Sequence, residues 1–109
     1  MNTAEFVALW KNHAEELYRD YISGDGETAV SKLFNSLSLD ENGKHTVNKL
    51  IETIIIDTHY SFLMGLAGCA NIGGVQQDYK LFAEDGSRIY EPGDLEAEAY
   101  EQFQENFMK

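Results

Sequence analysis

The segment from Thr46 to Ala67 is the most apolar part of this chain, and it limits the folds that the chain can adopt. Its apolar residues recur at helical spacing in a wide stripe made of Val47, Leu50, Ile51, Ile54, Ile55, Phe62, Leu63 and Leu66. A polar stripe beside it is made of Lys49, Thr53, Asp57 and Ser61. The pattern predicts a central helix that other elements contact from two sides. The β-branched run 53–58 is also compatible with a strand, but the length of the segment favours the helix.

Two helices are predicted ahead of this segment. Over residues 3–22, apolar side chains recur every three to four positions and charged side chains fill the other side. Asn2 or Thr3 can cap the start of this helix. A shorter helix is predicted over 28–37, with an inward face made of Ala29, Val30, Leu33, Phe34 and Leu37. The sequence Asp-Glu-Asn-Gly at 40–43 is typical of a turn.

The C-terminal part predicts a hairpin and a last helix. From Val75 the apolar period changes to two, which is typical of a strand. Residues 84–86 are predicted to form a three-residue hairpin loop with glycine in its left-handed position, and this register places Leu81 opposite Ile89. A last helix, capped by Asp94, is predicted to follow. The side chains that it is predicted to bury are four residues apart, namely Leu95, Ala99, Phe103 and Phe107. The predicted fold is α+β and predominantly helical, with about four helices, one β-hairpin between the third and the fourth, and a single domain over 1–109.

The glycine-rich stretch GLAGCANIGG, residues 65–74, contains the Gly-x4-Gly spacing that opens a phosphate-binding loop. Such a loop requires Lys and then Ser or Thr directly after its last glycine, and Gly74 and Val75 occupy these places. The order of elements is also inverted, because the stretch follows a predicted helix and leads into a predicted strand. We therefore expect no nucleotide site and interpret Gly68 as a left-handed helix stop.

The charge of the chain excludes several functions. With 19 acidic and 8 basic residues, the net charge is −11 at pH 7. A field of this sign repels nucleic acid and anionic membranes and attracts cationic partners, so we expect neither direct nucleic-acid binding nor membrane association. The first residues lack a basic region before an apolar run, and the predicted localisation is cytoplasmic. The one cysteine, Cys69, fits a reducing compartment, and we expect it to be a buried small side chain.

Asp57 and His59 are the best candidates for catalysis, because an acid and an imidazole two residues apart can form a general-base or metal site. On a helix, however, residues i and i+2 point to different sides. Ile55 and Leu63 lie one turn from His59 on either side, which is typical of a half-buried structural histidine. The other histidines have no second ligand at a metal-binding spacing. We therefore predict no catalytic residue, no metal and no cofactor.

The last third of the chain is the feature that most favours a binding function. Residues 78–109 hold nine acids and three bases, whereas a surface selected only for solubility normally mixes both signs. A solvated helix face is the alternative interpretation. We predict that this region binds a cationic protein partner. The predicted partner-binding residues are Glu84, Asp85, Glu91, Glu96, Glu98, Glu101, Glu105, Tyr90 and Tyr100.

The layout of residues 46–105 is a long apolar helix ending in glycine, a hairpin with an Asp-Gly turn, and an acidic helix. It resembles that of small acidic bacterial immunity proteins of contact-dependent inhibition and related polymorphic toxin systems. The resemblance carries no diagnostic motif and transfers no functional residue. It implies an inhibitor that neutralises a cationic toxin domain, often a nuclease, by blocking its active site. The alternatives are a phage-encoded inhibitor that mimics nucleic-acid charge, a small enzyme centred on Asp57 and His59, and an adaptor module whose charge keeps it soluble.

Overall fold

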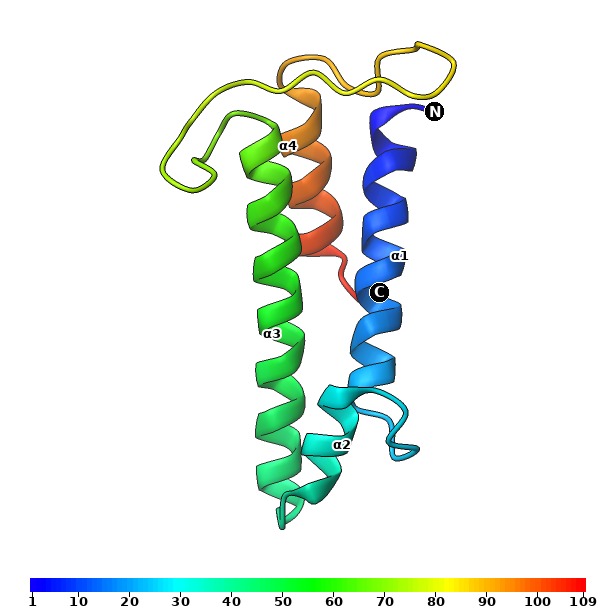
Figure 1. Cartoon of the computed structure of the whole chain (residues 1–109), viewed down its shortest axis with the longest axis vertical. Helices are drawn as coiled ribbons and strands as arrows, with labels where there is room; N and C mark the ends of the chain where they lie inside the picture. Colours follow the sequence, from blue (N-terminus) through cyan, green and yellow to red (C-terminus); the bar gives the residue numbers. More distant parts are fainter.

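The computed structural model describes all residues, 1–109, and its regular elements are helices (Figure 1). These elements are α1 (Thr3–Tyr21), α2 (Ala29–Ser36), α3 (Glu41–Leu66), α4 (Asp94–Ala99) and the π-helical segment η1 (Tyr100–Glu105). The only β-structure is a pair of isolated bridges. The predicted α+β class with a hairpin between the third and fourth helices is therefore wrong, because the fold is all-helical.

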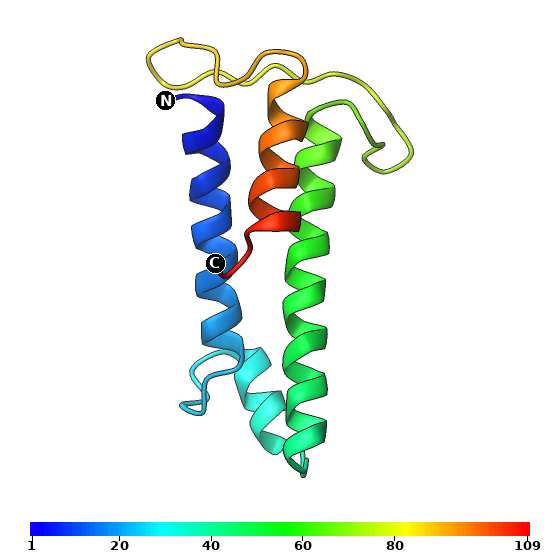
Figure 2. The same ribbon diagram turned by 180° about the vertical axis from the view of Figure 1, so that it is seen from behind.

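The two long helices, α1 and α3, lie side by side along an elongated molecule with extents of 49 × 29 × 24 Å (Figures 1 and 2). α4 and η1 form one continuous rod, here called the C-terminal helix. It packs against both long helices, but only in the half of the bundle that contains the start of α1 and the end of α3. α2 lies at the opposite end of the bundle. The two halves of the molecule are therefore packed differently.

The first two predicted helices are confirmed to within one residue at each end. Asn2 caps α1, because its side-chain oxygen accepts the backbone N–H of Glu5 at 2.8 Å. Thr28 and Ser31 cap α2 reciprocally, each side chain bonding to the backbone N–H of the other. Local sequence therefore determines where both helices begin.

The third helix is longer than the sequence predicts. Asp40 Oδ1 accepts the N–H of Gly43 at 2.7 Å, and this cap starts α3 at Glu41. The predicted turn at 40–43 is wrong, because the capping aspartate outweighs the Asn-Gly pair inside the first turn. The run 53–58 is helical, which excludes the strand alternative. Gly68 follows the helix with a left-handed φ of +80°, as predicted.

The C-terminal helix changes from α to π geometry at Tyr100. Leu95, Ala99, Phe103 and Phe107 are spaced four apart, and each is at most 8% exposed. In an α-helix, positions four apart are rotated by about 40° from each other, so four of them drift off a single face. The wider π turn rotates the chain less per residue, which turns the row back towards the core. The predicted inward row is thus confirmed, and the π segment explains how it fits.

The hydrophobic core lies where α1, α3 and the C-terminal helix meet. Its buried residues are Val7, Ala14, Ile55, Leu63, Ile89, Tyr90, Leu95, Ala99, Phe103 and Phe107. The Phe103 ring stacks on the imidazole of His59, with ring centroids 5.8 Å apart. None of these residues comes from α2, so the core belongs to one half of the bundle.

Residues 67–93 cross the end of the bundle as an irregular segment, here called the crossing segment. It leaves α3, passes over the start of α1 and returns to α4 (Figure 1). Where the hairpin is predicted, a single antiparallel bridge joins Phe82 and Arg88. The N–H of Ile89 donates to the Leu81 carbonyl at 3.0 Å, which is the predicted register. Pairing does not continue beyond this bridge, so no hairpin forms.

Exposure explains why the predicted strands are absent. A two-stranded ribbon is marginally stable in water unless one of its faces packs against other structure. Val75 is 56% exposed and Phe82 is 54% exposed, so the alternating residues of this segment have little to pack on. Asp94 also differs from its predicted role. Asp94 is the first residue of α4 and not its cap, and its carboxylate accepts the N–H of Glu91 at 3.3 Å rather than an amide of α4.

The crossing segment is instead attached by side chains that bond to backbone carbonyls. The hydroxyl of Tyr90 lies 2.6 Å from the carbonyl oxygen of Tyr79 and 3.1 Å from that of Leu66. The Thr3 hydroxyl donates to the Ile89 carbonyl at 2.9 Å and ties the segment to α1. Buried carbonyls without a donor are costly, so these contacts stabilise an otherwise irregular path.

Tyr90→Phe should lower the free energy of unfolding by about 1–2 kcal/mol, because two carbonyls lose their donor while the ring stays in place. Tyr100→Phe is the matched control, since the Tyr100 ring is 53% exposed, and it should change stability by less than about 0.5 kcal/mol. Urea denaturation followed by circular dichroism measures both variants. Equal stability of wild type and Y90F would contradict the role of this hydroxyl.

The same hydroxyl predicts a pH dependence. Burial raises the pKa of the Tyr90 phenol above its ordinary value of 10.0. Because the folded state favours the neutral phenol, its stabilising contribution is complete below pH 10 and is lost as the pH rises through the raised pKa. The stability difference between wild type and Y90F should therefore shrink in alkaline buffer, whereas Y100F should follow wild type throughout.

Candidate functional site

The C-terminal helix presents acidic side chains to solvent along one side. Glu101 and Glu105 are exposed, and Glu98 is half-buried. The Glu98 carboxylate accepts a hydrogen bond from the Gln102 side chain at 3.1 Å. Gln102 also donates to the Ala4 carbonyl at 3.0 Å, which fixes this side of the helix next to the first turn of α1. The predicted acids of this helix are therefore on a rigid element.

The other predicted acids lie elsewhere. Glu84 and Asp85 are exposed at the turn of the crossing segment that passes the start of α1, and Glu91 is exposed just before α4. The hydroxyl of Ser87 donates to Asp85 at 2.6 Å, and its backbone N–H donates at 2.9 Å. Both bonds lower the pKa of the Asp85 carboxyl, and the bond from the Ser87 hydroxyl has the larger effect. The structure therefore places Glu84 and Asp85 away from the C-terminal helix, whereas Glu91 lies next to the start of this helix.

The two predicted aromatic contacts have different environments. Tyr90 is 5% exposed and attaches the crossing segment, so its ring is not available to a partner. Tyr100 is 53% exposed and lies on the same helix as the acidic residues. Only Tyr100 can therefore contact a second protein without unfolding the core.

Few basic side chains of this chain form ion pairs with the predicted partner-binding acids. One ion pair involves a predicted binding residue, with Arg88 Nη1 3.3 Å from Glu91 Oε2. The remaining ion pairs join residues of α1 or α3. The other six predicted acids have no ion pair, and the C-terminal helix contains no basic residue. Their carboxylates are available for cations supplied from outside the chain.

A pocket of about 450 Å³ lies between the end of α3, the crossing segment and α4. Cys69 lines it and is exposed, so the expectation of a buried cysteine is wrong. Desolvation first, and then the charge of Glu96 and a hydrogen bond to it, raise the pKa of the Cys69 thiol, and Asp78 adds to the effect. A protonated thiol is a poor nucleophile and a poor metal ligand, so the pocket does not activate this residue.

Asp57 and His59 point in different directions. Asp57 is exposed, whereas His59 is half-buried and its Nδ1 lies 2.8 Å from the Ile55 carbonyl oxygen. The His59 ring stacks on Phe103 and meets Trp10 edge to face, with centroids 6.1 Å apart. No hydrogen bond joins the two candidate residues. Their geometry is that of an exposed helix acid and a packed aromatic side chain.

Sequence reasoning missed a second surface. Leu33 is 70% exposed, Leu37 50%, Leu50 57% and Ile54 55%, although the sequence predicts that all four point inward. These four residues are called the apolar face below. A groove of about 260 Å³ runs between α2 and α3 beside them, lined mainly by apolar side chains. The wide apolar stripe of α3 is the sequence signal for this surface, because it predicts that other elements contact α3 on two sides. This chain supplies only part of these contacts.

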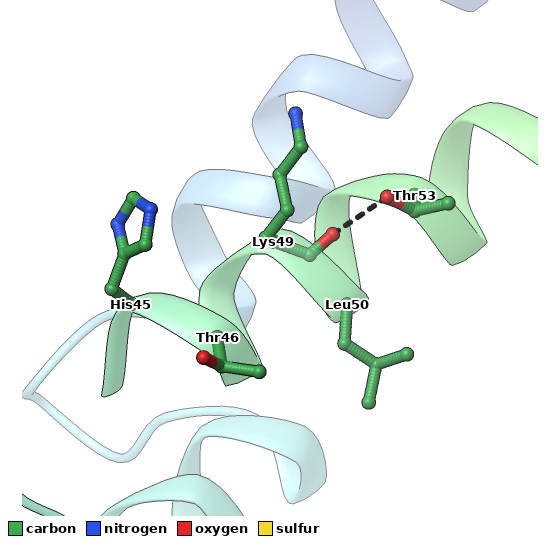
Figure 3. A pocket seen from close by; sticks show the side chains of 5 residues that line it. All are labelled: His45, Thr46, Lys49, Leu50 and Thr53. Carbon is green, nitrogen blue, oxygen red and sulfur yellow. Dashed lines mark hydrogen bonds between the residues drawn. The ribbon is translucent and has the colours of Figure 1, made fainter. Parts of the chain in front are cut away.

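A shallow depression on α3 shows how open this surface is (Figure 3). All five residues around it come from one helix, with His45 and Lys49 pointing to one side and Leu50 pointing away from them. Thr53 Oγ1 donates to the Lys49 carbonyl at 2.8 Å, so its hydroxyl is already bonded within the helix. Small-molecule sites need enclosing walls from more than one element. The depression is therefore an exposed helix surface.

No three His, Cys, Asp or Glu side chains come together in a way that could hold a metal ion. None of the helices has the length and apolar content that crossing a bilayer requires. Comparison of the chain with protein-family models, with curated proteins and with solved structures gives no significant match. The acidic side of the C-terminal helix and the apolar face are thus the two surfaces from which function can be inferred.

The environment of Cys69 predicts slow alkylation. Because the Glu96 carboxylate helps to raise the thiol pKa, Glu96→Gln should increase the iodoacetamide reaction rate at neutral pH by roughly a factor of two to five. Glu98→Gln removes a charge from the same helix on the side that faces α1 and should leave the rate unchanged. Mass spectrometry of timed samples measures both rates. Equal acceleration in the two variants would show that Glu96 has no specific effect.

Proposed function

We propose that this chain is a binding protein that neutralises a cationic protein partner in the cytoplasm, in the manner of bacterial immunity proteins. The observation that carries the proposal is the set of carboxylates without ion pairs, in particular the exposed Glu101 and Glu105 on the C-terminal helix. A surface with unpaired charges of one sign attracts a protein of the other sign and orients it during encounter.

The position of these acids supports a blocking role. The C-terminal helix is held by Phe103 and Phe107 in the core, so its outer side is presented on a rigid support. Rigid presentation reduces the entropy that is lost on binding. The exposed ring of Tyr100 provides an aromatic contact among the acids, and tyrosine is enriched in the residues that dominate binding energy.

The chemistry of carboxylates indicates what the partner presents. An arginine guanidinium matches a carboxylate with two parallel hydrogen bonds, whereas a lysine ammonium acts as a point charge. A partner whose active site binds phosphates through arginines, such as a nuclease, fits this surface. Blocking that site would require a one-to-one complex and no chemical step by this chain.

The proposal predicts the effect of reversing two charges. Glu101→Lys with Glu105→Lys should lower the association rate with a basic partner by about tenfold at low salt, because steering depends on these charges. Glu16→Lys with Asp20→Lys is the matched control, since both residues are exposed acids four positions apart on α1. Stopped-flow fluorescence at several salt concentrations, with a basic nuclease domain of a bacterial toxin as partner, measures the rates.

Three results would contradict the proposal. The basic nuclease domain could fail to bind, both double variants could lose the same fraction of the rate, or the association rate could be independent of salt. Retained circular dichroism in both variants serves as the folding control. The core row of the C-terminal helix is unchanged in both, so both should fold.

A further inference from the structure

The molecule exposes more surface than a compact monomer of its size. Its accessible surface is 6950 Å², whereas a folded monomer of 12.3 kDa exposes about 6,100 Å². The Cα radius of gyration is 16.3 Å, compared with about 13 Å for a compact domain of this length. The surplus of roughly 850 Å² is close to the roughly 800 Å² that each partner buries in a standard protein interface. The elongated chain therefore exposes enough surface beyond that of a compact monomer to accommodate one standard interface.

Part of the exposed surface is the apolar face. Monomeric proteins rarely expose a contiguous group of large aliphatic side chains. The apolar face is half or more exposed at every position, and two of its residues, Leu33 and Leu37, line the groove between α2 and α3. Nothing in the chain covers it, because the C-terminal helix runs only along the other half of the bundle (Figures 1 and 2).

The charge distribution favours a second copy of the same chain on this face. Residues 22–56 hold five acids and three bases, a net charge of −2, and the other residues carry the remaining −9. Two antiparallel copies joined through the middle of α3 would hold the C-terminal ends of their α3 helices, where the C-terminal helix begins, roughly 40 Å apart, at 1.5 Å per helical residue. That separation is several Debye lengths at physiological salt, so repulsion between the ends is screened.

The pattern along α3 is self-complementary in an antiparallel pair. Leu50 and Ile54 are neighbours one turn apart, and a two-fold axis between them places Leu50 of one copy against Ile54 of the other. Lys49 and Asp57 lie on the same flank of this apolar pair, in the polar stripe of α3. An antiparallel arrangement brings Lys49 of each copy towards Asp57 of the other. Lys49 now pairs with Glu52 at 3.4 Å, and such exposed pairs exchange at little cost.

We propose that the apolar face is the interface of a homodimer in which the α3 helices of two copies pack antiparallel about a two-fold axis, flanked by α2. The inference is independent of the cationic partner, because it uses the opposite half of the bundle. The dimer buries the side of the α3 stripe that the chain leaves exposed. It also leaves both C-terminal helices free.

Sedimentation velocity of the full chain over a concentration series tests the oligomeric state. Wild type should sediment as a dimer that dissociates on dilution. Leu50→Glu should raise the dissociation constant by roughly 30-fold or more, as expected for an interface anchor. Leu9→Glu is the matched control, because Leu9 is a leucine of α1 with 55% exposure, compared with 57% for Leu50, and it lies outside the apolar face. It should leave the constant unchanged.

A charge exchange tests the antiparallel arrangement. Lys49→Asp alone and Asp57→Lys alone should each weaken the dimer, because like charges would then face each other across the axis. The double variant K49D/D57K should regain wild-type affinity. Circular dichroism verifies folding, and all of these positions are exposed or half-exposed on one helix.

Several results would overturn the dimer. Wild type could remain monomeric at every concentration, or Leu50→Glu could leave a dimer intact. Equal weakening by Leu9→Glu would indicate non-specific association, and a double variant no tighter than the singles would exclude the antiparallel pair. A monomeric wild type whose Leu50→Glu variant loses the basic partner would assign the apolar face to that partner instead.

Discussion

The stacking of Phe103 on His59 attaches the C-terminal helix to α3, and the rest of the architecture follows from how far this attachment extends. α3 has 26 residues, whereas α4 and η1 have six each. A helix that is half as long can cover only half of the bundle, so the buried core is confined to that half. The crossing segment exists because the chain must leave α3 and enter α4 at the same end of the molecule.

This asymmetry separates two kinds of surface. The half that contains the core carries most of the negative charge on its outside, and the half without the C-terminal helix exposes aliphatic side chains. Charge acts at a distance and brings a partner to the surface, whereas apolar contact acts only after water has been excluded. A dimer joined through the apolar face would present two acidic helices on one particle, so it could engage two basic partners at once.

Local signals predicted much of the fold, and tertiary context decided the rest. Caps and helical spacing located α1 and α2, and the four-residue spacing from Leu95 to Phe107 identified the buried row. Periodicity cannot show whether a helix face has a partner, so the sequence predicts that Leu33 and Leu50 are buried, whereas both are exposed. The acids were visible as residue types, but their separation depends on the path of the crossing segment. The role of Tyr90 was hidden because its partners are backbone carbonyls, which any sequence supplies.

The π segment restricts how the C-terminal helix can vary in length. A π turn is equivalent to one extra residue in an α-helix, and deletion of one residue within 100–105 would restore regular hydrogen bonding there. The same deletion would draw Phe107 about 1.5 Å along the helix axis towards α4, although Phe107 would still face the core because the π turn already absorbs the extra residue. It would also displace the N–H of Met108, which donates to Glu15 at 2.7 Å. Relatives of this chain should therefore tolerate the loss of this one residue better than the loss of another residue of the C-terminal helix, while the irregular crossing segment can accept insertions and deletions.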